Sequence, residues 1–130
     1  MAKTLLALFL MPQVLIIDDE KHIRSILRTI LLSLGFKVKV AQDGRQGIEL
    51  FEDGCQFDLV ITDIRMPEIN GNQVAKHIRG SDNSGIPIIA ISGYNKEIDK
   101  RLFDFSIDKP FRLETITDVI EKLKRERRIC

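Results

Sequence analysis

The sequence is poor in cysteine and in aromatic residues. It contains two cysteines, one tyrosine and no tryptophan, and the aromatic residues together make up 6% of the 130 residues. Two cysteines, Cys55 and Cys130, form neither a disulfide framework nor a zinc-ligand pattern, so we expect a reducing, cytoplasmic compartment. No apolar run approaches the roughly 20 residues that a membrane-spanning helix needs, and we expect no membrane role.

The chain also lacks a strong excess of charge of one sign. Lys and Arg number 20, Asp and Glu number 19, and the net charge is +1. This balance gives no general attraction to nucleic acid, and we expect no direct nucleic-acid binding. The hydrophobic fraction of 44% is typical of a globular protein. The length corresponds to a single domain.

The two ends of the chain have compositions of their own. We predict an N-terminal extension over residues 1–11, a folded domain over 12–126 and a basic tail over 127–130. The extension contains an apolar stretch, residues 5–11, without a small-residue cleavage site. It is either a mis-assigned start, with Met11 as the true first residue, or an arm that packs on the domain or on a second copy. The basic C-terminal end is interpreted as a solvated helix end or as the start of a linker.

Strand patterns and helix patterns alternate five times along the chain. Runs that are apolar on both faces predict buried parallel strands, and a stretch that alternates apolar residues with lysine predicts an edge strand. Apolar residues at helical spacing follow each strand. The predicted strands are 14–17, 36–40, 57–61, 86–91 and 105–107, and the predicted helices are 23–34, 48–54, 74–78, 96–102 and 113–123. The fold class is therefore α/β, with a mainly parallel sheet and helices on both faces.

Polar residues stand at the ends of four predicted strands. The first strand ends in Asp18-Asp19, the third in Asp63, the fourth in Ser92 and the fifth at Lys109. Because ligands bind beyond the carboxyl ends of such strands, we expect these side chains to meet. Three neighbouring carboxylates resist ionisation unless a cation lies among them, and a site of oxygen ligands suits Mg²⁺. A lysine and a hydroxyl beside that ion favour a phosphoryl group, which a carboxylate nucleophile can accept as an aspartyl phosphate.

Each of these residues also has a simpler interpretation when it is taken alone. Asp19 could cap the first helix, and Ser92-Gly93 could be a turn. The coincidence of Asp19 with Asp63 and Lys109 favours the acidic pocket.

The order of these motifs resembles that of a response-regulator receiver domain of two-component signalling, as in CheY-like proteins. The resemblance runs from Gln13 to Arg125, and it implies a flavodoxin-like, doubly wound sheet of five parallel strands in the order 2-1-3-4-5 with about five helices. Residues 12–126 would be the receiver domain. The resemblance depends on Asp18-Asp19-Glu20, on Asp63-Ile64-Arg65-Met66-Pro67 with Gly71, on Ser92-Gly93, and on Lys109-Pro110-Phe111.

The resemblance implies a role for each site residue. Asp63 would accept the phosphoryl group. Asp19 and Asp63 would bind Mg²⁺ together with the backbone carbonyl of Arg65, and Asp18 would act through a bound water. Ser92 and Lys109 would contact the phosphoryl oxygens, and the bond between Lys109 and its following proline is typically cis in this family.

The implied function is transfer of a phosphoryl group to Asp63 and a conformational switch toward an output partner or output domain. The donor would be the phosphohistidine of a sensor histidine kinase or a phosphotransfer protein, or a small acyl phosphate. We expect a monomer or weak dimer, and no enzyme beyond self-phosphorylation and self-dephosphorylation. Two alternatives remain: a small phosphatase with an aspartate nucleophile, disfavoured because such enzymes carry Asp-x-Asp after the first strand, and a scaffold that is never phosphorylated.

The chain departs from the family pattern in one region. Many receivers carry Tyr or Phe three residues before the lysine, where this chain has Ser106. Phe105 cannot substitute, because neighbouring strand residues point to opposite faces. The stretch from Ser92 to Lys109 is short, so the fourth helix should be short or irregular. We also hypothesise that Arg65 shields the phosphoryl group and alters its lifetime.

Overall fold

Five parallel strands form the centre of the fold in the order β2-β1-β3-β4-β5. The structure, a computed structural model, describes residues 10–93 and 95–129, so most of the predicted N-terminal extension lies outside the described residues. The strand order is the one that the resemblance implied. The strands are β1 (Gln13–Ile17), β2 (Lys37–Ala41), β3 (Leu59–Asp63), β4 (Ile88–Ser92) and β5 (Phe105–Asp108).

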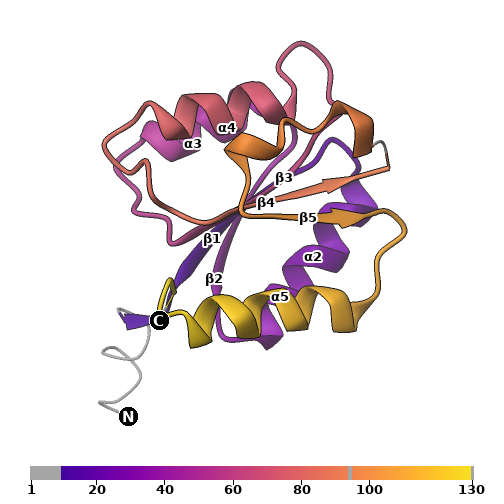
Figure 1. Ribbon diagram of the computed structural model, residues 1–130. Helices are drawn as coiled ribbons and strands as arrows, with labels where there is room; N and C mark the ends of the chain where they lie inside the picture. Colours follow the sequence, from indigo (N-terminus) through magenta and orange to yellow (C-terminus); the bar gives the residue numbers. More distant parts are fainter. Residues whose placement is uncertain (1–9, 94, 130) are drawn as a thin grey trace.

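Two pairs of α-helices cover the two faces of the sheet, as the alternating pattern predicted (Figure 1). One pair, α2 and α5, packs on one face, and α3 and α4 pack on the other. No helix among the described residues is long and apolar enough to cross a membrane. The helices are α2 (Lys21–Ser33), α3 (Gly44–Glu52), α4 (Gly71–Arg79) and α5 (Leu113–Arg125).

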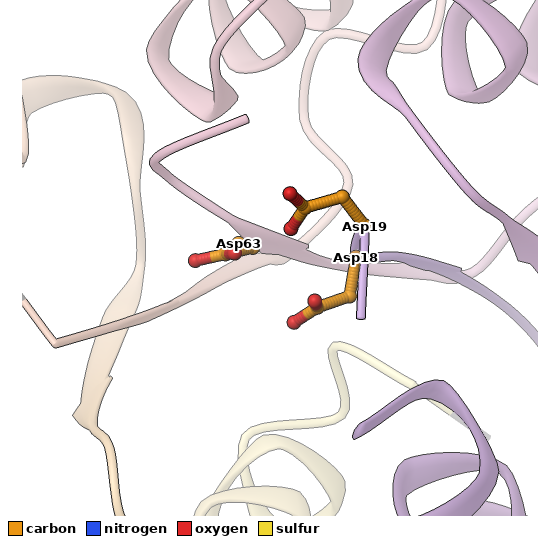
Figure 2. A group of neighbouring side chains, drawn as sticks. All are labelled: Asp18, Asp19 and Asp63. Atoms are coloured by element: carbon orange, nitrogen blue, oxygen red, sulfur yellow. The ribbon is translucent and has the colours of Figure 1, made fainter. Parts of the chain in front are cut away.

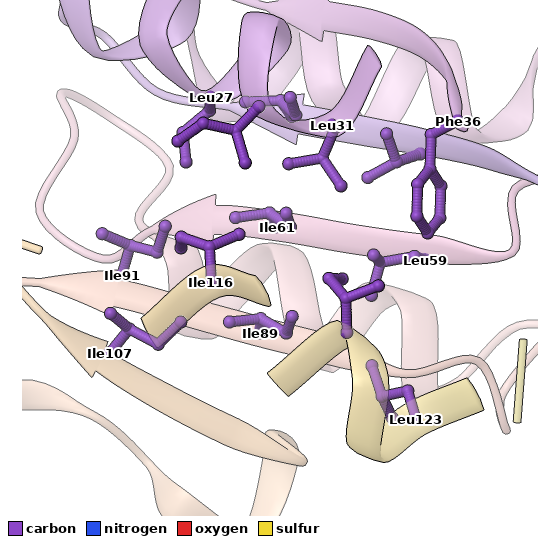
Figure 3. Close-up of a cluster of buried hydrophobic side chains, with 14 of the residues drawn as sticks. Leu27, Leu31, Phe36, Leu59, Ile61, Ile89, Ile91, Ile107, Ile116 and Leu123 are labelled. Carbon is purple, nitrogen blue, oxygen red and sulfur yellow. The ribbon is translucent and has the colours of Figure 1, made fainter. Parts of the chain in front are cut away.

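The central strands are buried on both faces, which explains their uninterrupted apolar runs. Figure 3 shows the larger of the two main clusters, in which Leu27 and Leu31 of α2 meet Ile116 of α5 across the sheet residues Ile61 and Ile89. The second cluster joins α3 and α4 to the other face. β2 forms an edge of the sheet, as the lysines in its sequence predicted. This packing holds the carboxyl ends of the strands in fixed positions.

The predicted fourth helix is not an α-helix. In its place the described chain forms two 3₁₀ turns, η1 (Asn95–Glu97) and η2 (Lys100–Leu102), so the expected number of about five α-helices is reduced to four in the described chain. The segment is short, and the side chain of Asp99 accepts a hydrogen bond from the backbone N–H of Arg101, which favours a tight local turn over a continuing helix. The expected irregularity of this element is confirmed.

The edge strand β5 places its first two side chains on opposite faces. Phe105 packs against the cluster beneath α5, where the ammonium of Lys122 lies 5.3 Å from the centre of its ring. Ser106, at the position where many receivers carry an aromatic residue, is exposed. Phe105 therefore does not replace that aromatic residue, as strand alternation predicted.

The chain turns back onto the domain after α5. Arg127 adopts a left-handed conformation (φ 57°), and the N–H of Arg128 donates to the carbonyl of Leu123. This turn brings the guanidinium of Arg128 to 2.7 Å from Asp104 and buries Ile129 in the cluster beneath α5. The segment after α5 therefore contributes one apolar side chain, that of Ile129, to the core.

Candidate functional site

Four loops at one edge of the sheet bring the predicted site residues together. Asp18 follows β1, Asp63 ends β3, Ser92 ends β4 and Lys109 follows β5. The backbone N–H of Lys109 donates to the carbonyl of Ser92 at 3.0 Å. Asp63 is paired in register with Ile91, the residue before Ser92. The sheet register therefore fixes these residues as neighbours.

Three carboxylates form a cluster at this edge (Figure 2). One oxygen from each of Asp18, Asp19 and Asp63 lies within 4.8 Å of the other two. Asp18 and Asp63 are buried, and Asp19 is exposed and lines an open hollow of about 280 Å³. A cation and its bound waters could thus approach from the side of Asp19.

Lys109 supplies the positive charge that faces the buried carboxylates. Its ammonium lies 3.1 Å from Asp18 Oδ2, 3.3 Å from Asp63 Oδ2 and 3.6 Å from Glu20 Oε1. The peptide bond between Lys109 and Pro110 is cis, as expected from the resemblance. The structure therefore places Asp18, Asp63 and Lys109 in direct contact.

The alternative interpretation of Asp19 as a helix cap is wrong. The N-cap residue of α2 is Glu20, and that helix has no capping hydrogen bond from a side chain. Instead Asp18 Oδ1 accepts the N–H of Glu20 at 2.9 Å, and Arg24 of α2 donates to the backbone carbonyl of Asp18 at 2.8 Å. These bonds orient Asp18 and leave the Asp19 carboxylate at the rim of the cluster.

Hydrogen bonds and the close approach of α4 hold the backbone around Asp63. Asp63 Oδ1 accepts the N–H of Ile64 at 2.8 Å, and the N–H of Gly71 donates to the carbonyl of Ile64 at 2.8 Å. A Cβ atom at Gly71 would lie 2.2 Å from the carbonyl oxygen of Asp63. Glycine is therefore required where α4 begins, and it fixes the position of the Asp63 side chain.

Burial is the largest cause of the raised pKa values of the two buried carboxyl groups, Asp18 and Asp63. Burial, and then the charge of Asp18, raise the pKa of Asp63 to about 6. Burial opposes the charge on Lys109, but attraction to Asp18 and Asp63 outweighs it, so the pKa of Lys109 is raised. One ammonium does not fully compensate the two buried carboxylates.

The set of donors fits a hard divalent cation. All three side chains offer carboxylate oxygens, and a small number of protein ligands with room for water suits Mg²⁺. The raised pKa values of Asp18 and Asp63 reflect a site whose negative charge favours an added cation.

The side chains of the two remaining site residues lie in different environments: that of Ser92 is buried and that of Arg65 is exposed. Ser92 is buried at the end of β4, and the preceding residue, Ile91, is paired in register with Asp63. Arg65 is largely exposed and forms an ion pair with Glu97 of η1. No feature of the sequence pointed to Glu97, because the conformation of two loops decides this pairing. No role was predicted from the sequence for Glu20 beside Lys109 or for Arg24 beside Asp18. Glu20 directly follows the Asp18-Asp19 pair, and Arg24 lies in the first turns of α2.

Known proteins resemble this chain over most of its length. The family model described as the response regulator receiver domain matches residues 14–121. A solved structure of the response regulator protein TrrA from Thermotoga maritima, in complex with Mg²⁺-BeF, is similar with a TM-score of 0.79 and 31% identity. The match covers 87% of this chain and 99% of that one.

Curated relatives include both kinases and regulators. The sensor histidine kinase AtsR of Burkholderia thailandensis is 29% identical over 117 residues, which cover 85% of this chain and 19% of AtsR. The transcriptional regulatory protein CpxR of Escherichia coli K12 is 33% identical over 106 residues, which cover 78% of this chain and 44% of CpxR. The chain therefore spans less than half the length of these relatives.

Proposed function

The chain belongs to the response-regulator receiver domain family, and from this membership we propose that it accepts a phosphoryl group on Asp63 in an Mg²⁺-dependent reaction. The observation that supports this proposal is the contact of two buried carboxylates with one ammonium at the carboxyl edge of the sheet. The proposed donor is a phosphohistidine of a sensor kinase or phosphotransfer protein.

Asp63 is the proposed nucleophile. A carboxylate oxygen of Asp63 attacks phosphorus, the bond between phosphorus and the imidazole nitrogen breaks, and the imidazole leaves. Bonds from Ile64 to Asp63 and from Gly71 to Ile64 hold the carboxylate in place, which reduces the orientational cost of the attack.

The residues around Asp63 have separate proposed roles. Asp19 and Asp63, with the backbone carbonyl of Arg65, would hold Mg²⁺, and Asp18 would act through a water. A bound Mg²⁺ would neutralise the carboxylates and the charge on the phosphoryl oxygens. Lys109 donates to the phosphoryl oxygens, and the Ser92 hydroxyl donates to another.

The output of the domain is proposed to be a conformational switch. Phosphorylation converts the Asp63 carboxylate, which carries one negative charge, into an acyl phosphate that carries nearly two. A conformational state that binds this added charge better is then favoured. The curated relatives include a sensor kinase and transcriptional regulators. We therefore propose that the switch acts on an output partner or on an output domain. We propose that the chain performs no multiple-turnover chemistry on other substrates.

Intact-mass measurement after incubation with acetyl phosphate and Mg²⁺ tests the proposal. Wild-type protein should gain the mass of one phosphoryl group, and Asp63→Asn should gain none. Asp118→Asn is the matched control, because Asp118 is an exposed aspartate on α5, and this variant should be phosphorylated like the wild type.

Two other outcomes contradict the proposal. Wild-type protein that stays unmodified with acetyl phosphate and with several sensor kinases indicates a scaffold. Repeated turnover of a generic phosphate ester indicates a phosphatase.

A further inference from the structure

An ion pair joins the two loops that lie on either side of the phosphorylation site. Arg65 stands in the loop after β3, two residues beyond Asp63, and Glu97 stands in η1, which follows β4. Asp63 ends β3 and Ser92 ends β4. The contact between Arg65 and Glu97 therefore crosses the sheet edge between the two strands that supply the acceptor and the hydroxyl.

Asn72 of α4 provides a second connection between the same segments. Its Nδ2 donates to the backbone carbonyl of Glu97 at 2.6 Å, and its Oδ1 accepts the N–H of Asp99 at 3.0 Å. The backbone of η1 is thus held to the start of α4 by Asn72, and the Glu97 side chain is left to face Arg65.

We propose that Glu97 is a positioning residue for Arg65 and competes with the phosphoryl group on Asp63 for its guanidinium. This inference rests on the proposed function. In the unmodified protein Glu97 holds Arg65; after phosphorylation Arg65 turns to the phosphoryl oxygens, and the tie between the β3–α4 loop and η1 is released. The exchange offers a link from Asp63 to the surface beside β5, where this chain has Ser106 in place of an aromatic residue.

Three physical features support an exchange of partners. Both side chains are more than two-fifths exposed, so each can move without opening the core. A phosphoryl group carries more negative charge than a carboxylate and accepts two hydrogen bonds from one guanidinium. Arg65 follows Asp63 by two residues, so its long side chain can reach a group bound to Asp63.

Thermodynamic linkage makes the proposal measurable. If the phosphoryl group weakens the contact between Arg65 and Glu97, then removal of Glu97 must strengthen phosphoryl binding by the same factor. Exposed ion pairs contribute little, which sets the expected factor at about two to five.

The test measures the dissociation constant of beryllofluoride, a phosphoryl mimic, in the presence of Mg²⁺. Glu97→Gln should bind beryllofluoride about two to five times more tightly than the wild type. Arg65→Gln should bind it more weakly, and Glu97→Gln added to Arg65→Gln should have no further effect. Glu68→Gln is the matched control: Glu68 lies in the same loop and pairs with Arg45 instead, and it should leave the constant unchanged.

Hydrogen exchange of the amides of residues 95–99 gives a second measurement. Beryllofluoride should speed their exchange in the wild type, and in Glu97→Gln the exchange should already be fast and change little on binding.

The outcomes separate the two proposals. A wild type that binds no beryllofluoride contradicts the proposed function. Normal binding with equal constants for Glu97→Gln and Glu68→Gln overturns the exchange alone, and so does a tighter constant for Glu97→Gln that persists without Arg65.

Discussion

The ammonium of Lys109 lies 3.1 Å from Oδ2 of Asp18, although the two residues come from opposite ends of the domain. Asp18 is 1% exposed, so its charge depends on this ammonium when no cation is bound. The same ammonium contacts Asp63, and the stability of the metal-free site therefore depends on Lys109.

Replacement of Lys109 should destabilise the metal-free protein and increase the effect of Mg²⁺. Lys109→Met leaves two buried carboxylates without their positively charged partner, and we expect the unfolding free energy to fall by about 1–3 kcal/mol at pH 7.5. The loss is limited because one carboxylate can take up a proton and become neutral. The stabilisation by Mg²⁺ should exceed that of the wild type, because the metal then supplies the missing charge. Urea denaturation with EDTA and with Mg²⁺ measures both quantities.

Lys100→Met provides the control for this substitution. Lys100 is exposed, so its loss should change stability by less than about 0.5 kcal/mol. An equal or smaller Mg²⁺ effect in Lys109→Met would contradict the electrostatic account of the site.

Substitution of Asp63 should stabilise the metal-free protein at neutral pH. The pKa of Asp63 in the folded state, about 6, exceeds the ordinary value of 3.8, so the folded state binds the proton more tightly than the unfolded state. The wild type therefore loses stability as the pH rises from about 4 to about 6, and the full penalty persists above that range. We expect Asp63→Asn to be more stable by about 1–3 kcal/mol at pH 7.5 and by little at pH 4.

Urea denaturation in EDTA between pH 4 and pH 7.5 measures the difference in unfolding free energy between Asp63→Asn and the wild type. A constant difference between Asp63→Asn and wild type, or one that grows as the pH falls, would show that burial of the charge is not its cause.

The sequence predicted the fold because the buried strands carry their own signal. The apolar runs of β1 and β4 are uninterrupted, and the polar residues after them mark where each strand ends. Gly35 directly follows the first predicted helix, and after α2 it has a positive φ of 93°, a conformation that glycine adopts without strain. Strand pairing then follows from the family pattern, since a sheet of this kind leaves few arrangements for five strands.

Two features could not be predicted, because tertiary contacts decide them. The segment over 96–102 has weak helical spacing, and contacts of Asn72 and Asp99 set its 3₁₀ turns. The partner of Arg65 depends on how two loops meet in space. At the site, the residues Asp18, Asp63, Ser92 and Lys109 were found from strand ends alone, whereas Glu97 carries no pattern that a sequence could reveal.

Magnesium should raise the thermal stability of the protein through Asp19. Asp19 is the exposed member of the carboxylate cluster, and it contributes no capping bond to α2, so its replacement should change the fold little. At about ten times the dissociation constant, Mg²⁺ should stabilise the wild type by about 1.4 kcal/mol. Asp19→Asn should lose most of this gain.

Thermal unfolding with and without Mg²⁺ checks this expectation, and Glu121→Gln serves as the control. Glu121 is an exposed acidic residue of α5, so its loss changes the net charge equally and should keep the full gain. An equal loss in both variants would indicate general screening of charge instead of a site.

Gly71 should tolerate no side chain, because α4 begins directly against the acceptor strand. A Cβ at this position would lie 2.2 Å from the Asp63 carbonyl oxygen and 2.9 Å from Ile64 Cα, and both are backbone atoms that cannot rotate away. Gly71→Ala must therefore shift α4 or the end of β3, which we expect to cost about 2–4 kcal/mol. The shift also displaces Asp63, so phosphorylation by acetyl phosphate should slow at least tenfold even where the variant is folded.

Gly85→Ala separates this close approach from a general effect of glycine replacement. A Cβ at Gly85 would meet no described atom within 4 Å, and the substitution should be neutral or stabilise the protein by up to about 1 kcal/mol. Denaturation midpoints and the rate of mass gain with acetyl phosphate give the two measurements for both variants. If Gly71→Ala retains wild-type stability and rate, then the backbone beneath Asp63 yields easily, and its rigidity does not position the acceptor.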